Sequence, residues 1–128
     1  MPNVLLSYDD SSAKLTVEQV LHSLRINPVH LILEEFDAEF LLTEMFDLII
    51  FELFGENRSC VAILEQLEKF AATSGIDHPP VIVVTEQGLG AVEQALRTAK
   101  VNFFFVKPVS EAELAAAISQ SLHLSEVF

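Results

Sequence analysis

The stretch that decides the fold is Asp47–Gly55, DLIIFELFG. Apolar residues run without a break into one acid, Glu52, and a glycine closes the stretch soon afterwards. A continuous apolar run of this length, rich in residues that favour strands, predicts a β-strand buried on both faces. An acid at the carboxyl end of such a strand lies at the rim of the sheet, where open α/β folds place their functional groups. Glu52 is therefore the first residue that needs an explanation.

Apolar segments of strand type recur along the chain and alternate with segments of helical periodicity. Besides the opening stretch, strands are predicted at residues 4–8, 29–33, 81–84 and 102–106. Amphipathic helices are predicted after the cap-type residues 9–12, over 37–44, over 60–71, over 89–99, and after the capping box of Ser110 and Glu113. This alternation predicts an α/β fold with a parallel sheet and helices on both faces. The most apolar strands, at 48–51 and 81–84, should be central, and the one at 29–33 should lie nearer an edge.

Composition and charge restrict the class of protein. The 128 residues fit a single domain over 1–128, and 51% of them are hydrophobic, enough for a core. The formal net charge of -12 argues against direct nucleic-acid binding and favours a partner with a cationic patch. A single cysteine and the lack of a basic, signal-like start suit a cytoplasmic protein. No apolar run approaches the roughly 18 residues of a transmembrane helix.

The predicted topology brings chemically useful side chains together. Because all strands of a parallel sheet point the same way, their carboxyl ends meet at one edge. Carboxylates gathered there can hold Mg²⁺, and a lysine with a threonine hydroxyl can hold phosphate oxygens. Those groups are typical of phosphoryl transfer. The residues at this edge are Tyr8, Asp9, Asp10, Glu52, Thr85 and Lys107.

At these residues the sequence resembles the receiver domain of bacterial two-component response regulators. DLIIFEL is similar to the family's DLxxxD strand, PPVIVVT to its fourth strand, and FFFVKP to its fifth strand ending in Lys-Pro. The resemblance covers nearly the whole chain. It implies a flavodoxin-like (βα)₅ doubly wound sheet with the strand order 2-1-3-4-5, which agrees with the pattern of strands and helices.

The resemblance also implies roles for individual residues. Glu52 matches the phosphoacceptor position, Thr85 the switch hydroxyl, Phe104 the switch aromatic, and Lys107 the lysine that binds phosphate. The bond between Lys107 and Pro108 is a candidate cis peptide, which an X-Pro bond allows at little cost.

Two departures from the family pattern concern the chemistry. The family phosphorylates an aspartate, whereas Glu52 carries its carboxylate one methylene further out and could instead pair with Lys107. A plain surface acid is the simpler interpretation of Glu52. The family's paired metal-site acids match either Tyr8 and Asp9, or Asp9 and Asp10, depending on one insertion. Helix capping is a strong competing role for Asp9 and Asp10.

Three consecutive phenylalanines and the cysteine complete the candidate residues. Phe103, Phe104 and Phe105 cannot all face one way in a strand, so they either pack under helices or leave aromatic surface for a partner. We expect Cys60 to be buried and inert.

We therefore predict a pseudo-receiver: not an enzyme, and a domain that signals by protein–protein contact without phosphorylation. The expected partner is a histidine kinase or a downstream signalling protein. It would bind at the helix predicted over 89–99, the strand at 102–106 and the helix that begins at Ser110, with a homodimer as a further option. No cofactor is required on this prediction. The alternative is a working phosphoacceptor that takes a phosphoryl group from a histidine kinase with Mg²⁺.

Overall fold

The computed structural model describes residues 2–9, 16–35, 44–54, 59–75, 79–85 and 101–123. Within these ranges the strands are β1 (Val4–Tyr8), β2 (Val29–Ile32), β3 (Leu48–Leu53), β4 (Val81–Thr85) and β5 (Phe103–Val106). The helices are α1 (Thr16–Ser23), the 3₁₀ helix η1 (Leu33–Glu35), α3 (Ser59–Ser74) and α5 (Glu111–His123). The helices predicted at 37–44 and 89–99 fall mostly or wholly outside the described residues.

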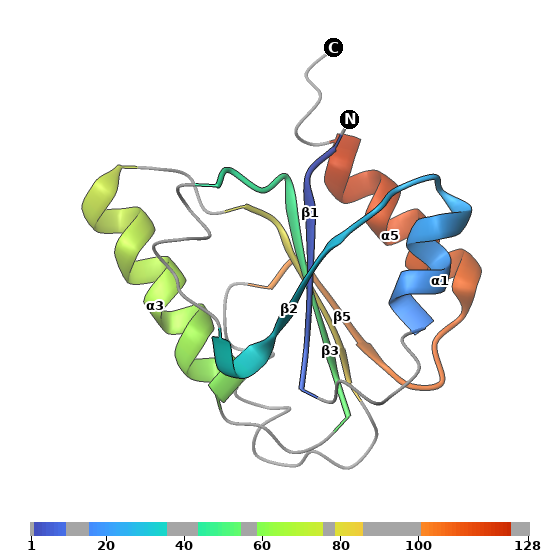
Figure 1. Ribbon diagram of the computed structural model, residues 1–128, viewed down its shortest axis with the longest axis horizontal. Coiled ribbons are helices and arrows are strands. Elements are labelled where there is room, and N and C mark those ends of the chain that lie inside the picture. Colours follow the sequence, from blue (N-terminus) through green and yellow to red (C-terminus); the bar gives the residue numbers. More distant parts are fainter. Residues whose placement is uncertain are drawn as a thin grey trace.

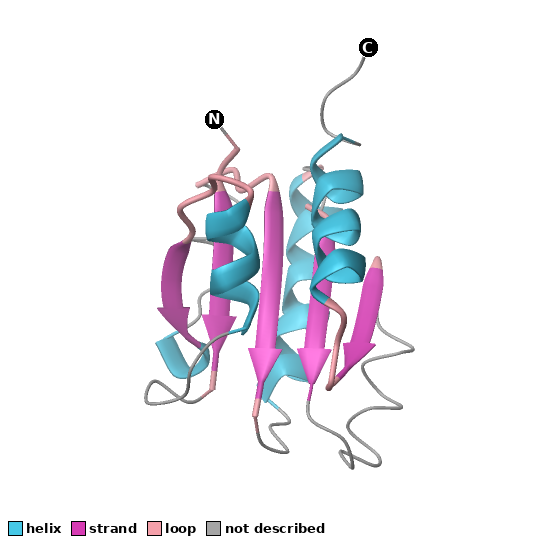
Figure 2. Ribbon diagram, turned by 90° about the vertical axis from the view of Figure 1, so that its right-hand side faces the viewer, coloured by secondary structure: helices cyan, strands magenta, loops and turns pink. Residues whose placement is uncertain are grey.

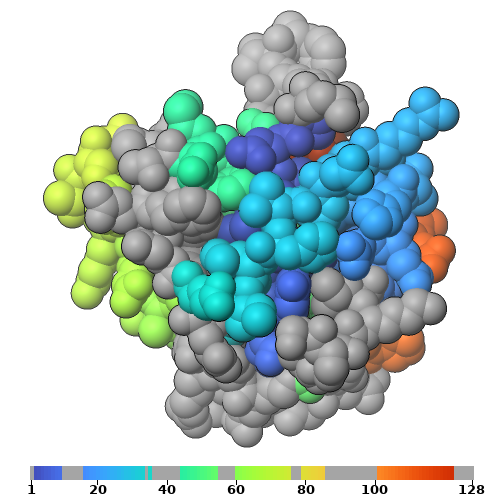
Figure 3. Space-filling view, viewed as in Figure 1, coloured from blue at the N-terminus to red at the C-terminus, as the bar shows by residue number. Residues whose placement is uncertain are grey.

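The strands form one parallel sheet in the order β2-β1-β3-β4-β5, as predicted. The most apolar strands, β3 and β4, lie inside the sheet, and β2 lies at an edge. In the space-filling view, β2 and η1 (cyan) lie in front of parts of β1 (Figure 3). Strand 29–33 is one residue shorter than predicted because Leu33 begins η1 and turns its side chain into the core.

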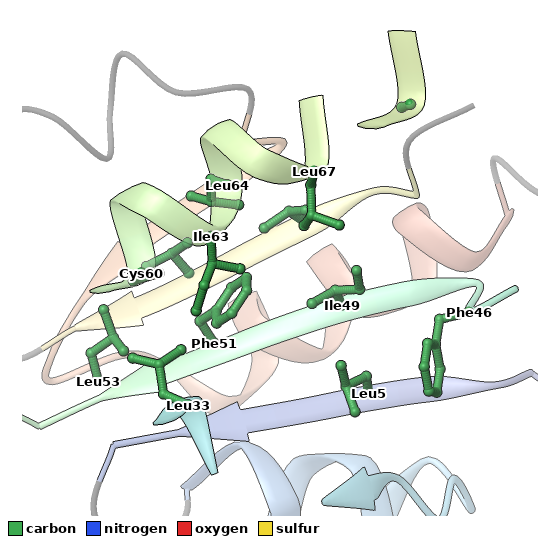
Figure 4. Close-up of a cluster of buried hydrophobic side chains, with 13 residues drawn as sticks. Leu5, Leu33, Phe46, Ile49, Phe51, Leu53, Cys60, Ile63, Leu64 and Leu67 are labelled. Carbon is green, nitrogen blue, oxygen red and sulfur yellow. The ribbon is translucent and has the colours of Figure 1, made fainter. Parts of the chain in front are cut away.

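Helices cover both faces of the sheet: α3 covers one, and α1 and α5 cover the other (Figure 1). Each strand residue alternates between the two faces, so β3 supplies both cores. The α3 side holds Phe51, Leu53 and Cys60 among thirteen buried residues (Figure 4). The α1/α5 side holds Ile50 and Val84 with residues of both helices. β3 is buried at every position, which agrees with its unbroken apolar run.

The phenylalanines of β5 follow the alternation. Phe103 and Phe105 pack on the α1/α5 side with their rings 6.4 Å apart and nearly parallel, and Phe104 packs on the α3 side. All three are partly buried, although β5 is an edge strand. For Phe103 and Phe105, the expected packing under a helix is therefore confirmed on the α5 side. The helix predicted at 89–99, the other cover expected, lies outside the described residues.

The carboxyl ends of all strands point to the same edge of the sheet (Figure 2). This edge brings together residues that are far apart in the sequence, from β1, β3, β4 and β5. Within the described residues, no helix combines the length and the apolar character that a membrane span requires.

Candidate functional site

Glu52 lies one residue before the carboxyl end of β3, between Tyr8 of β1 and Val84 of β4. Its exposed fraction is 0%. The interpretation of Glu52 as a plain surface acid is therefore wrong. A carboxylate removed from water in this way is tolerated when hydrogen-bond donors and an opposite charge surround it.

The first donors come from the start of α1. The backbone N–H of Val17 donates to Glu52 Oε1 over 3.0 Å, and that of Thr16 donates to Oε2 over 3.1 Å. Amides in the first turn of a helix have no carbonyl partner within the helix, and the helix dipole favours a negative charge beside them. Glu52 therefore caps α1 from another element of the fold.

The opposite charge comes from Lys107, directly after β5. Its Nζ lies 2.8 Å from Glu52 Oε2, and its side chain is 15% exposed. The backbone N–H of Lys107 donates to the carbonyl of Thr85 over 2.8 Å, which extends the pairing of β5 with β4. The bond from Lys107 to Pro108 is cis, as predicted. The ion pair that the sequence suggested between Glu52 and Lys107 is thus present.

An aromatic ring forms another side of the lysine's environment. Lys107 Nζ lies 3.9 Å from the centre of the Phe54 ring, a cation–π contact. The backbone N–H of Phe54 in turn donates to Asp9 Oδ1 over 2.8 Å. The carboxylate of Asp9 thereby holds the backbone of Phe54, the residue that follows β3.

Asp9 also acts on the cysteine at the start of α3. Burial, and then the negative charge of Asp9, raise the pKa of the Cys60 thiol to about 12. Cys60 is fully buried, as expected, and its thiol stays protonated at neutral pH.

The identity of the acidic pair, Tyr8 with Asp9 or Asp9 with Asp10, stays open. Tyr8 packs on the α1/α5 side, and its ring meets that of His30 edge-on at 6.0 Å. Asp10 lies outside the described residues. Among those described, no group of three or more His, Cys, Asp or Glu side chains is placed to hold a metal ion. Both oxygens of Glu52 already accept hydrogen bonds, and Oε2 also pairs with Lys107. The Mg²⁺ site that the resemblance implies stays a prediction, because Asp10 lies outside the described residues.

Thr85 ends β4 beside Leu53 and Val106, on the α3 side of the sheet. It is fully buried, and its Oγ1 has no hydrogen-bond partner among the described residues. Its carbonyl reaches Lys107, but its side chain lies on the opposite face from Glu52. Phe104, the other predicted switch residue, shares the α3 side with Thr85. The structure thus brings Glu52, Lys107 and Asp9 together at the carboxyl edge of the sheet. The predicted switch residues, Thr85 and Phe104, lie on the α3 side.

Sequence reasoning missed two groups of this site. The amides of Thr16 and Val17 carry no side-chain signal, although a helix that follows β1 must begin at the same edge as Glu52. Phe54 was taken only as part of the strand, yet its place two residues after Glu52 puts it beside Lys107.

Comparison with solved structures gives the fold a name. The receiver domain of a signal transduction histidine kinase from Syntrophus aciditrophicus matches with a TM-score of 0.77, at 19% identity, over 100% of this chain and 95% of that one. A response regulator receiver protein from Pseudoalteromonas atlantica gives 0.75, at 19% identity, over 97% and 99%. A response regulator receiver domain protein from Clostridium thermocellum gives 0.70, at 19% identity, over 98% and 98%.

The chain has the fold of response regulator receiver domains. No protein-family model matches the chain, and no curated protein matches it. Within this receiver fold, Glu52 occupies the end of the central strand and Lys107 the end of β5, as the motifs predicted. Their roles in signalling are a separate question.

Proposed function

We propose that this domain is a pseudo-receiver of a two-component system, which signals by binding another protein and does not take up a phosphoryl group. One observation carries the proposal: the carboxylate of Glu52 is buried and holds two backbone amides and the ammonium of Lys107. A carboxylate that attacks phosphorus needs a free oxygen aimed at it, and a misplacement of about 1 Å can cost about a hundredfold in rate.

The surroundings of Glu52 support the same conclusion. Lys107, which would have to hold phosphate oxygens, is already paired with Glu52 and packed on Phe54. The proposal requires no cofactor, because a domain that takes up no phosphoryl group does not need Mg²⁺ for the transfer. The domain is then a binding module and not an enzyme. Thr85 and Phe104 match the switch positions in the resemblance, and we expect them to act in packing here.

The partner that fits is a histidine kinase or a downstream signalling protein with a cationic surface. The chain carries a net charge of -12, which attracts such a surface. The face that we expect to bind is built on β5 and α5, together with residues 89–99. On it, Phe103 and Phe105 are only partly buried, and partly exposed aromatic rings are frequent anchors of interfaces. A homodimer could use the same face.

Intact mass after incubation with a small-molecule phosphodonor and Mg²⁺ tests the proposal. The variant Glu52→Asp runs alongside, and Glu52→Ala serves as the control without a carboxylate. The proposal expects no added phosphate on the wild-type protein. Phosphate gained by the wild type and lost in Glu52→Ala would overturn it in favour of a working phosphoacceptor.

The aspartate variant adds information on the rest of the site. If Glu52→Asp gains phosphate and the wild type does not, the glutamate alone blocks the reaction. If neither gains phosphate, the site cannot support the transfer even with an aspartate. Both outcomes agree with a pseudo-receiver, and they differ in whether the remaining residues still support the chemistry.

A further inference from the structure

We propose that the outer edge of β2 binds an extended segment of another protein, in which apolar and basic residues alternate, as an added strand of the sheet. This edge lies at the opposite end of the strand order from β5, so it is separate from the face expected to bind the signalling partner. The inference goes beyond the proposed function, because it gives the domain a second binding surface and lets it hold two proteins at once.

The edge of the sheet at β2 is open. Residues Val29–Ile32 pair with β1 on one side, and no described strand pairs with them on the other. In the space-filling view, β2 and η1 (cyan) lie on the surface that faces the viewer (Figure 3). Alternate residues of an edge strand direct their backbone N–H and C=O groups away from the paired neighbour. The outer edge of β2 therefore offers donors and acceptors to an incoming strand.

The sequence of β2 does little to prevent such pairing. Edge strands in natural proteins commonly carry lysines or other charges that oppose the approach of another strand. β2 (VHLI) has no charged Lys, Arg, Asp or Glu. Val29, at 44% exposed, is one of two exposed large hydrophobic side chains among the described residues, and Met45 is the other. Pro28 precedes the strand and has no N–H to donate, so it limits pairing at that end to β2 itself.

The two faces of β2 differ, and they define the chemistry of the partner. Val29 pairs with Leu5 of the α3-side core, and Leu31 packs against that core, so both lie on the α3 side. His30 lies on the opposite side, where its Nε2 is 2.9 Å from Glu18 Oε1 of α1. Side chains on one face of neighbouring strands lie next to each other. An incoming strand therefore meets apolar side chains on one face and a carboxylate on the other.

Charge decides between a basic segment and a second copy of this chain. Glu18 is 33% exposed beside the strand, and Glu35 is exposed beyond the carboxyl end of β2. The whole chain carries a net charge of -12, so two copies repel each other, whereas Lys and Arg side chains are attracted. The occupant is thus a segment whose apolar residues face Val29 and Leu31 while its Lys or Arg residues face Glu18.

A synthetic peptide of alternating valine and lysine, with blocked ends, serves as the probe. The control peptide has the same composition and charge, but its valines form one block and its lysines another. It cannot place the two kinds of side chain on opposite faces of a strand. Titration of each peptide into the isotope-labelled chain, followed by NMR, gives the affinity and the hydrogen exchange of the β2 amides.

We expect the alternating peptide to bind about fivefold or more tightly than the block peptide, and to slow the exchange of the outward amides within Val29–Ile32. Val29→Lys should weaken binding about fivefold or more, because it removes an apolar contact and puts a positive charge beside the incoming strand. Ala116→Lys makes the same change of charge on the exposed face of α5 and is the matched control. It should leave the binding of the peptide unchanged.

Equal binding of the two peptides, or equal losses in Val29→Lys and Ala116→Lys, would show that net charge alone attracts the peptide, and the proposal would be wrong. Unchanged exchange of the β2 amides would also overturn it, and that readout uses the wild type, so it does not depend on the folding of Val29→Lys. Self-association of the wild type in sedimentation, removed by Val29→Lys, would show that the edge pairs with a second copy instead. None of these readouts involves phosphorylation, so the phosphodonor test of the proposed function is independent of them.

Discussion

Glu52 Oε2 lies 2.8 Å from Lys107 Nζ, and this pair joins the central strand β3 to the segment between β5 and α5. The same carboxylate holds the first turn of α1. Because α1 and α5 pack on each other over this face of the sheet, one side chain ties together the elements that cover it. The candidate site and the stability of the fold therefore depend on the same atoms.

Loss of the lysine should destabilise the domain strongly. Lys107→Met keeps the length of the side chain but leaves Glu52 as a buried carboxylate whose partners among the described residues are the two α1 amides. We expect the free energy of unfolding to fall by about 2–4 kcal/mol, since breaking one partner out of a buried pair leaves an uncompensated charge. Urea unfolding at neutral pH measures the change.

A more exposed pair, between α1 and β2, provides the control. Glu18 Oε1 lies 2.9 Å from His30 Nε2, with side chains 33% and 39% exposed. Water solvates both partners, so Glu18→Gln should cost less than about 1 kcal/mol. A loss of similar size in Glu18→Gln and Lys107→Met would contradict the structural role of the buried pair.

The raised pKa of Cys60 predicts a fall in stability at high pH. The thiol has a pKa of about 12 in the folded chain, against an ordinary value of 9.0, because of burial first and the charge of Asp9 second. Between these values the unfolded chain releases a proton that the folded chain keeps. Stability is thus unaffected below about pH 9 and falls by about 1.4 kcal/mol per pH unit above it, until the folded pKa is reached. Urea unfolding at a series of pH values from 8 to about 10.5 measures this slope.

Cys60→Ala separates this effect from other groups that titrate in the same range. The variant is less stable at every pH because it leaves a small cavity. The difference between the wild type and the variant should shrink as the pH rises above about 9. A difference that stays constant over that range would show that the thiol does not keep its proton in the folded chain.

Most of the fold follows from the pattern of apolar runs. The unbroken run at 48–51 predicted a strand buried on both faces, and β3 is central and fully buried. The mixed run at 29–33 predicted an edge strand, and β2 lies at the edge. The predicted strand extended one residue too far, to Leu33. An apolar residue there fits a strand, but Leu33 begins η1 and packs in the core.

The site was predicted in part. Strand ends carry side chains of recognisable chemistry, so Glu52 and Lys107 could be placed together from the sequence. The burial of the Glu52 carboxylate could not be predicted, because it depends on where α1 begins and on the position of the Phe54 ring beside Lys107. The direction of the Thr85 side chain depends on the register of β4 against β3, which a sequence does not show.

A buried hydroxyl on α5 offers a stabilising change. Ser121 is fully buried, and its Oγ has no hydrogen-bond partner among the described residues. Ser121→Ala removes that group and replaces it with the residue of highest helix propensity, so we expect a gain of about 0.5–1.5 kcal/mol in thermal or urea unfolding. Ser23→Ala is the matched control, because the Ser23 hydroxyl donates to the carbonyl of Val20 over 2.6 Å. A gain in Ser23→Ala equal to that in Ser121→Ala would show that helix propensity alone is responsible.

A substitution at Arg25, just after the C-terminal end of α1, should also stabilise the domain. This residue has a φ of 62°, and the bonds around it, from Arg25 N–H to the His22 carbonyl and from Ile26 N–H to the Leu21 carbonyl, close a Schellman motif. The left-handed conformation at that position costs any residue with a Cβ, so Arg25→Gly should raise the free energy of unfolding by about 0.5–1 kcal/mol. Arg25→Ala removes the same charge but keeps the Cβ, and we expect no gain from it in urea unfolding. Equal stability of the glycine and alanine variants would mean that the side chain, and not the backbone conformation, sets the energy at this helix end.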